Sequence, residues 1–147
     1  MGREQLEDMG PVDYVVLEWQ HEQPRGEVAP MILDLVDRGI IRILDVAFVL
    51  KDVDGDVAGL EIDALDGEAE KFREFHGAAS GLLDDEDLRE AANALEPGTS
   101  AAVLVWENAW AAPIATALRR SGGQLVASGR IPIQALLASV EAAEAVR

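Results

Sequence analysis

Alternating apolar and polar positions predict strands in the first half of the chain. Residues 12–19 read Val-Asp-Tyr-Val-Val-Leu-Glu-Trp, which is rich in the branched and aromatic types that favour strands. Residues 40–51 form a longer pattern of the same kind. The acidic turn at 52–56 separates them from 57–63, where apolar residues alternate with polar ones again. We therefore expect a β-hairpin over residues 40–63.

Helical spacing predicts helices before and after this hairpin. Residues 27–38 place apolar side chains on one stripe, and Gly39 follows in the position of a C-terminal cap. After the hairpin, residues 68–76 form one helical piece. A second piece follows with apolar residues at i, i+3, i+4 and i+7, and either Asp84 or Asp85 can cap it.

The last third of the chain gives the clearest succession of elements. Residues 100–107 are almost continuously apolar and predict a buried strand, and residues 108–121 predict the helix that follows it. Gly122-Gly123 ends that helix. Residues 124–130 then predict another strand, and residues 131–146 predict a C-terminal helix that begins near Pro132.

The order of these elements predicts an α+β fold. The first six elements follow the βαββαβ order of a ferredoxin-like split βαβ sandwich, extended by a C-terminal helix, strand and helix. A chain of 147 residues is the size of one domain. We expect a disordered extension over residues 1–8 and a single α+β domain over residues 9–147.

The strand at 100–107 is apolar on both of its faces, and this predicts self-association. Ala102, Leu104 and Trp106 lie on one side, and Ala101, Val103 and Val105 on the other. Both sides need a cover. Helices can cover one of them, which leaves the other to the additional C-terminal helices or to a second copy of the protein. We therefore expect a homo-oligomer.

Composition and charge narrow the classes of function. The chain has no cysteine, so it can hold no disulfide, thiolate metal site or cysteine nucleophile. Its formal net charge of −16 repels phosphate backbones and anionic lipids, so we expect no nucleic-acid and no membrane partner. The charged N-terminal residues do not form a secretory signal, and no apolar run approaches the ~20 residues of a membrane span. These features predict a cytoplasmic protein.

Trp106, Glu107, Asn108 and Trp110 form the most unusual local cluster. Two indole rings and a carboxamide at a strand-to-helix turn suit an interface or a small-molecule pocket. The sequence favours a purely structural interpretation, in which Asn108 caps the helix, Trp106 packs in the core and Trp110 lies over the helix start. We keep this cluster as the candidate interface or ligand pocket.

The sequence contains no constellation that predicts catalysis or metal binding. Glu18 and Glu107 each end a strand, but the first and fourth strands of a split βαβ sheet are antiparallel, so the two carboxylates should lie at opposite ends. The acidic turn at 52–56 lacks the glycine at the sixth position and the spacing of a calcium loop. We expect no catalytic residues, no metal site and no cofactor.

Four stretches of sequence resemble a known family. They are Met9 to Tyr14, Leu35 to Ile41, Gly77 to Asp85 and Leu118 to Gly123. Together they resemble a domain-of-unknown-function family of small, acidic actinobacterial proteins. The order of elements is more distantly similar to bacterial glycine-zipper domains that are labelled predicted membrane proteins. Here the glycine-rich hairpin is reduced to the joint at 77–81, so the membrane label does not carry over. The resemblance implies a fold and a taxonomic range, and it supplies no functional residues.

These observations favour a non-enzymatic protein. The first hypothesis is a homo-oligomeric or partner-binding module with a stress or housekeeping role, whose partner is a second copy or an unidentified protein. The alternative is a small-molecule sensor or carrier with its pocket near Trp106 and Trp110. An enzyme ranks third, because it would need a polar pocket with a carboxylate or histidine of strongly perturbed pKa.

Overall fold

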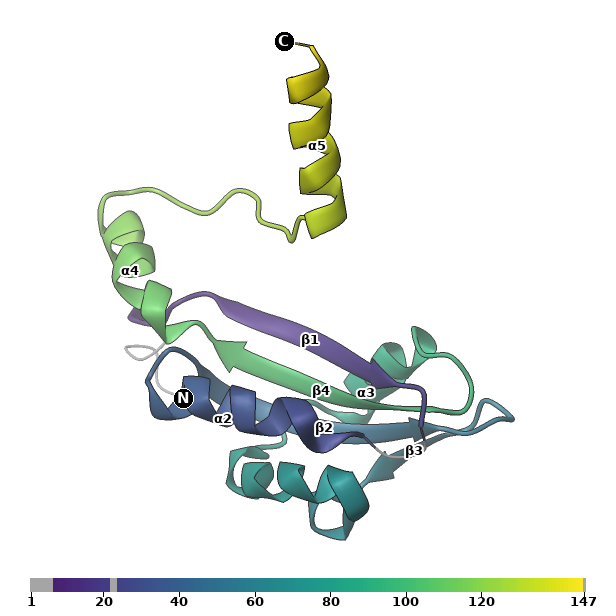
Figure 1. The fold of residues 1–147 in the computed structure, drawn as a ribbon. Coiled ribbons are helices and arrows are strands. Elements are labelled where there is room, and N and C mark those ends of the chain that lie inside the picture. Colours follow the sequence, from purple (N-terminus) through teal and green to yellow (C-terminus); the bar gives the residue numbers. More distant parts are fainter. Residues whose placement is uncertain (1–6, 22–23, 147) are drawn as a thin grey trace. The chain divides into compact units, whose positions relative to one another are not determined.

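The computed structural model describes residues 7–21 and 24–146. They form an α+β fold with one antiparallel four-stranded sheet in the order β1-β4-β2-β3 (Figure 1). The strands are β1 (Val12–Trp19), β2 (Arg42–Lys51), β3 (Val57–Leu60) and β4 (Thr99–Glu107). The strands predicted at 12–19, 40–51 and 100–107 and the β2–β3 hairpin are confirmed, whereas the strand predicted at 57–63 ends at Leu60. The sheet order does not by itself establish a ferredoxin-like sandwich, which stays a prediction.

The chain groups into two compact units. The sheet unit comprises residues 1–117 and contains the four strands. The C-terminal unit comprises residues 118–147, and α4 (Ala112–Arg120) crosses the boundary between them. The grouping does not test the predicted single domain over residues 9–147. Of the predicted disordered extension, residues 1–6 lie outside the described part of the chain.

One face of the sheet carries the larger core. It is covered by α2 (Ala29–Asp37), which continues the short 3₁₀ helix η1 (Gly26–Val28), and by η2 (Ile62–Ala64) and η3 (Gly67–Ala78), both also 3₁₀ helices. Phe72 of η3 is fully buried, and its ring lies 5.1 Å from that of Phe48 and 5.8 Å from that of Trp19, measured between centroids. These edge-on ring contacts fix η3 on the sheet.

The predicted cap at Gly39 is confirmed by the end of α2. Gly39 has a φ of 71°, and its N–H donates to the Val36 carbonyl while that of Ile40 donates to Leu35. This pair of bonds is the Schellman arrangement, which favours glycine because other residues are strained at positive φ. The cap turns the chain sharply into β2.

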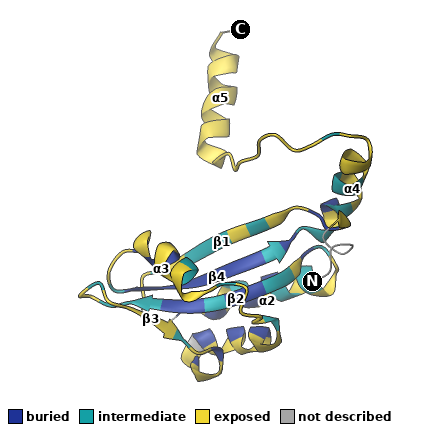
Figure 2. Ribbon diagram, turned by 180° about the vertical axis from the view of Figure 1, so that it is seen from behind, coloured by how far each residue is buried: buried dark blue, intermediate teal, exposed yellow. Residues whose placement is uncertain are grey.

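The opposite face is covered by α3 (Asp85–Asn93). Ala91, Ala92 and Leu95 pack against Val49 of β2 and Ala101 and Val103 of β4. Figure 2 shows that β4 is buried along nearly all of its length, whereas β2 mixes buried and partly buried residues. The sequence left this face to be covered by the additional C-terminal helices or by a second copy. That expectation is wrong where α3 covers the face. The two helical pieces predicted after the hairpin separate, one to each face of the sheet.

The C-terminal unit departs from the sequence prediction at one element. Residues 124–130 form no strand, and the chain has no regular structure from Gly123 to Pro132. A strand exists only when a neighbour satisfies its backbone N–H and C=O groups, and the residues that the structure describes offer this segment none. The predicted C-terminal helix is present as α5 (Ile133–Ala145), and no residue of α5 is buried.

Candidate functional site

Glu107 joins three segments at one end of the sheet. It lies at the end of β4 and is 6% exposed. Its Oε2 accepts a hydrogen bond of 2.8 Å from the Gly10 N–H, and its Oε1 accepts one of 2.9 Å from Nε of Arg42. The carboxylate therefore ties the chain entering β1 and the first residue of β2 to the end of β4.

These bonds set the protonation state of Glu107. Burial alone raises its pKa, but the hydrogen bonds from Gly10 and Arg42 and the positive charge of Arg42 outweigh burial, so the pKa lies below its usual value. A carboxyl group with a lowered pKa and both oxygens engaged is a poor general base. Glu107 holds the fold together at this junction.

Asn108 and Gly10 close the same junction. Asn108 lies at the N-cap position of η4 (Ala109–Ala111), but its side chain does not cap the helix. Its Nδ2 donates instead to the Pro11 carbonyl at 3.2 Å and to Oδ2 of Asp13 at 3.0 Å. Gly10 packs so closely that a Cβ there would collide with the carbonyl oxygen of Asn108. The turn after β4 is thus fastened to the start of β1.

The two tryptophans of the predicted cluster differ in burial. Trp106 is half-buried and packs against the larger core, while Trp110 is 60% exposed. The backbone N–H of Trp110 donates to the Ile40 carbonyl at 3.1 Å, which fixes the start of η4. Trp106, Glu107, Asn108 and Trp110 are therefore neighbours in a structural junction. Their role as an interface or ligand site stays a prediction.

Glu18 and Glu107 lie at opposite ends of the sheet, as the topology predicts. In the antiparallel β1–β4 register, Glu18 pairs with Ala101 and Glu107 pairs with Val12. The two carboxylates therefore cannot act together on one substrate.

Asp45 is the buried carboxylate that the sequence analysis did not single out. It is 2% exposed, and a bulge in the β2–β4 register lies between Ile43 and Asp45. Its Oδ1 accepts from the N–H groups of Val46 and Ser80, both at 2.9 Å, and its Oδ2 accepts from that of Leu83 at 2.7 Å. These bonds hold the segment that passes from η3 on one face to α3 on the other. The sequence signal that could have identified Asp45 is its position as the single aspartate within an otherwise apolar stretch of β2.

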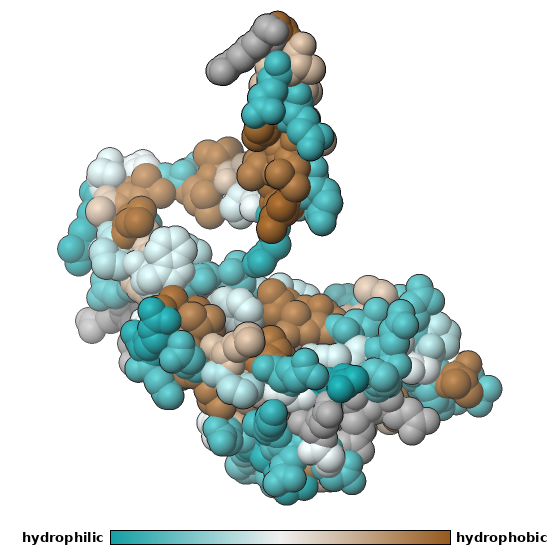
Figure 3. Space-filling model, viewed as in Figure 1, coloured by the Kyte–Doolittle hydropathy of each residue, from teal (hydrophilic) through white to brown (hydrophobic). Residues whose placement is uncertain are grey.

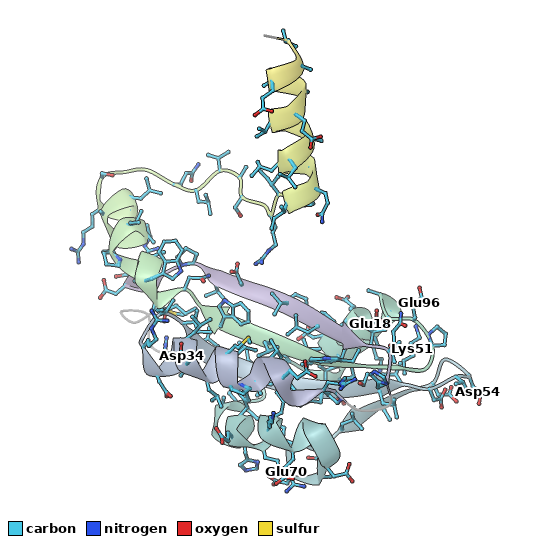
Figure 4. All side chains as sticks on the ribbon, in the orientation of Figure 1. Glu18, Asp34, Lys51, Asp54, Glu70 and Glu96 are labelled. Carbon is cyan, nitrogen blue, oxygen red and sulfur yellow. The ribbon has the colours of Figure 1, made fainter. Side chains whose placement is uncertain are left out.

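Polar side chains hold both ends of α3. Asp84 and Asp87 form a capping box at its start. At its end, Nζ of Lys51 donates to the carbonyls of Ala92 and Leu95, both at 3.1 Å. Oε2 of Glu18 accepts from the Glu96 N–H at 2.8 Å, and Figure 4 shows Glu18, Glu96 and Lys51 near one another at this end of the sheet. These charged side chains therefore stabilise the two ends of α3.

Residues 79–84, which pass from η3 on one face of the sheet to α3 on the other, form the crossing segment. A groove of about 490 Å³ lies beside it. It is lined by Arg42, Ile43 and Leu44 of β2, by Gly77 and Ala78 of η3, and by Ser80, Gly81 and Leu82. Its volume falls within the range of small-molecule sites. Nε of Arg42 is bound to Glu107, and the described residues provide no further partner for its two Nη atoms. The hydroxyl of Ser80 donates to the Leu44 carbonyl at 2.6 Å.

β1 forms a long, apolar edge of the sheet. It pairs with β4 on one side, and no described strand lies on its other side. None of its eight residues is buried. Val12 is 49% exposed and Tyr14 51%, and Asp13 and Glu18 are its only charged residues. The other edge strand, β3, has only four residues. A long apolar edge of this kind is a site for pairing with another strand.

The C-terminal unit is apolar and exposed. Ile133, Leu136, Leu137 and Val140 of α5 are each at least 51% exposed, and Figure 3 shows apolar residues gathered along one side of that helix. Leu125 and Val126 in the preceding segment are 66% and 85% exposed. The unit contains four arginines and two glutamates, which gives it a net charge of +2. Because the whole chain carries −16, residues 1–117 carry −18.

The described residues contain no group of three or more His, Asp or Glu side chains arranged to hold a metal ion. The predicted acidic hairpin turn is confirmed: Oδ1 of Asp52 accepts from the N–H groups of Asp54 and Asp56, both at 2.9 Å. No helix in the described ranges is both long and apolar enough to cross a bilayer.

The family of the chain emerges from comparison with known proteins. Residues 8–145 match the model of DUF6325, a family of unknown function, so the chain belongs to that family. Comparison with curated proteins and with solved structures finds no match. The predicted membership in a domain-of-unknown-function family is confirmed. The actinobacterial range and the distant glycine-zipper likeness stay predictions.

Proposed function

We propose that this member of the DUF6325 family is a non-enzymatic module of the cytoplasm that works by self-association through the free edge of β1. One observation carries the proposal: an eight-residue edge strand, mostly apolar, of which no residue is buried. Proteins commonly shorten, charge or cover such edges. β1 is eight residues long, is charged only at Asp13 and Glu18, and has no described strand on its outer side, which favours a partner strand.

The buried carboxylates support a role without catalysis. Glu107 and Asp45 each have both carboxylate oxygens occupied by donors of the fold. A general acid or base must exchange a proton with a substrate within hydrogen-bond reach. These two groups could do so only by giving up the bonds that join the elements of the sheet unit.

The mass of the protein in solution tests the proposal. We expect light scattering and native mass spectrometry of the full chain to give a defined oligomer over the micromolar range. Tyr14→Lys places a charge on the β1 edge, where the side chain is 51% exposed and lies near the acidic Asp87 and Glu90. The variant should fold and lose the association. A monomer for the unchanged chain would overturn the proposal.

A small-molecule sensor or carrier is the second candidate function, and the groove beside Arg42 is the observation that favours it. The free end of the guanidinium and the surrounding Ile43, Leu44 and Leu82 suit a small carboxylate with an apolar body. Neither Trp106 nor Trp110 lines this groove. The proposed pocket therefore moves away from the tryptophans that the sequence favoured.

Filling the groove tests this second candidate. No atom lies within 4 Å of a Cβ built on Gly77, whose φ is not positive, so Gly77→Leu should fold and occupy the space. We expect short-chain aliphatic carboxylates to raise the melting temperature of the unchanged protein and to have no effect on this variant. Gly59→Ala, also without a neighbour at its Cβ, is the control. Equal responses of all three proteins would exclude the groove as the binding site.

A further inference from the structure

We propose that residues 124–145 of one copy complete the sheet of a second copy. Residues 124–130 would add as a strand beside β1, and α5 would cover apolar surface next to that edge. This inference rests on the proposed self-association and names the segment that makes the contact.

Residues 124–130 and the outer side of β1 both lack a hydrogen-bonded strand partner among the described residues. Residues 124–130 have the composition that predicts a strand, yet they have no strand partner among the described residues. β1 has eight residues and one unpaired side. Pairing would satisfy the backbone groups of both segments, and seven residues are enough to follow most of the edge.

The side chains are also complementary. In the sheet unit, Val15 and Leu17 of β1 are only half-buried on the face of the larger core, and Trp106 lies half-buried beside them. In the C-terminal unit, α5 presents Leu136, Leu137 and Val140 to solvent. A helix with an apolar side is stable in water when that side packs on a sheet or another helix. The half-covered edge of the sheet is a surface of that kind.

Charge favours this pairing over contact between two sheet units. The sheet unit carries −18 and the C-terminal unit +2, with arginines at 119, 120 and 130 in its described part. Two sheet units would repel each other, whereas a C-terminal unit against a sheet unit brings opposite charges together. The negative charge of the sheet unit also disfavours an unrelated acidic partner at the β1 edge.

The size of the segment fits a stable interface. Standard interfaces use about 20–30 residues on each side, and residues 118–146 supply about that number. In a two-fold dimer the exchange would be reciprocal, so that the contact occurs twice. No residue of α4 or α5 is buried, and the proposal assigns their apolar side chains to the surface of a second copy.

A proline in the segment separates this inference from self-association in general. Val126 is 85% exposed and lies outside any helix or strand, so Val126→Pro should not disturb the fold of one chain. Proline cannot donate to a strand ladder, and the mass should therefore fall to that of a monomer. Val53→Pro is the matched control, because Val53 is 80% exposed and occupies the second position of the turn closed by Gly55 N–H to Asp52 O, which accepts proline.

The mass measurement on the unchanged chain and the two proline variants has three possible outcomes. An oligomer that becomes a monomer in Val126→Pro alone supports the inference. An oligomer that survives in Val126→Pro overturns the inference and leaves the proposed function standing. A monomer for the unchanged chain overturns both.

Crosslinking then identifies the contact. Because the chain has no cysteine, Tyr14→Cys and Ala127→Cys can be mixed as two separate single-cysteine proteins and treated with a short bis-maleimide. We expect a linked pair of different chains, identified by mass spectrometry of the joined peptides. Val53→Cys mixed with Ala127→Cys should give no such pair. A chain that carries both Tyr14→Cys and Ala127→Cys and links only within itself, at monomer mass, would overturn the exchange between copies.

Discussion

The two units of this chain use the same kinds of residue to opposite effect. In the sheet unit, Leu104 of β4 has no exposed surface, because helices cover both faces of the sheet. In the C-terminal unit, Leu136 of α5 is 54% exposed, although its neighbours along the helix are equally apolar. Burial is thus decided by the partner that a residue finds, and an apolar pattern alone predicts only that a partner is needed.

The polar side chains sharpen the comparison. In the sheet unit, Asp45, Glu107 and Lys51 each receive or donate at least two hydrogen bonds that join separate elements. In the C-terminal unit, the hydroxyls of Ser121 and Ser139 donate to carbonyls only three or four residues away. The hydrogen bonds of Asp45, Glu107 and Lys51 thus span long sequence separations, whereas those of Ser121 and Ser139 are local.

The largest difference is expected from one substitution made in both units. Leu104→Ala removes a fully buried side chain and should lower the free energy of unfolding by about 2–5 kcal/mol. Leu136→Ala should change it by less than about 0.5 kcal/mol in dilute protein, because the side chain is exposed in a single chain. Urea unfolding at low and high protein concentration measures both. The proposed exchange requires the Leu136→Ala loss to grow with concentration. Equal losses in dilute protein would contradict the comparison.

Asp45→Ala should come next. The substitution leaves the N–H groups of Val46, Ser80 and Leu83 without their acceptor, and we expect a loss of about 3 kcal/mol. Asp54→Ala is the matched control, since that carboxylate is exposed in the hairpin turn and its removal should cost less than about 0.5 kcal/mol. Thermal and urea unfolding of both variants give the comparison. If the two losses were alike, Asp45 would not be what fastens the crossing segment.

Glu107 predicts a dependence of stability on pH. Its pKa in the folded state lies below the ordinary value of about 4.3 in the unfolded chain, so between these values the unfolded state binds more protons. Its contribution to stability is therefore complete above about pH 4.3 and is lost as the pH falls through the lowered folded-state pKa.

Glu107→Gln removes that contribution. We expect this variant to lose about 1–2 kcal/mol at pH 7, because one donor then faces an amide N–H₂, and to fall less steeply than the unchanged chain below pH 4. Urea unfolding at pH 3, 4, 5 and 7 measures the difference. Glu144→Gln makes the same chemical change at an exposed residue of α5 and should cost little at pH 7. Parallel profiles for the unchanged chain and Glu107→Gln would contradict the role given to Glu107.

The elements of the sheet unit could be predicted from the sequence because their signals are local. The alternation in β1 and β2, the cap at Gly39 and the capping Asp84 each depend on neighbours within a few residues. The separation of η3 and α3 onto opposite faces could not be predicted in the same way. It depends on Asp45, whose partners Ser80 and Leu83 lie 35 and 38 residues away in the chain.

The candidate site divides along the same line. Trp106, Glu107, Asn108 and Trp110 were recognisable as an unusual local cluster, but their role in the junction depends on Gly10, Pro11 and Arg42. No local pattern connects residues 97 positions apart, such as Gly10 and Glu107. The strand predicted at 124–130 failed for a related reason: composition predicts the preference for a strand, and only a partner can make one.

Ser100→Ala should have the smallest effect, and it is the one substitution expected to stabilise the chain. Ser100 has no exposed surface, and its hydroxyl has no hydrogen-bond partner among the described residues. An unpaired buried hydroxyl is costly, so its removal should raise the free energy of unfolding by about 0.5–1 kcal/mol. Ser128→Ala removes an exposed hydroxyl from the C-terminal unit and should change nothing measurable. A loss of stability in Ser100→Ala would mean that the Ser100 hydroxyl does have a hydrogen-bond partner. The buried polar groups of the sheet unit would then be more completely hydrogen-bonded than the described contacts show.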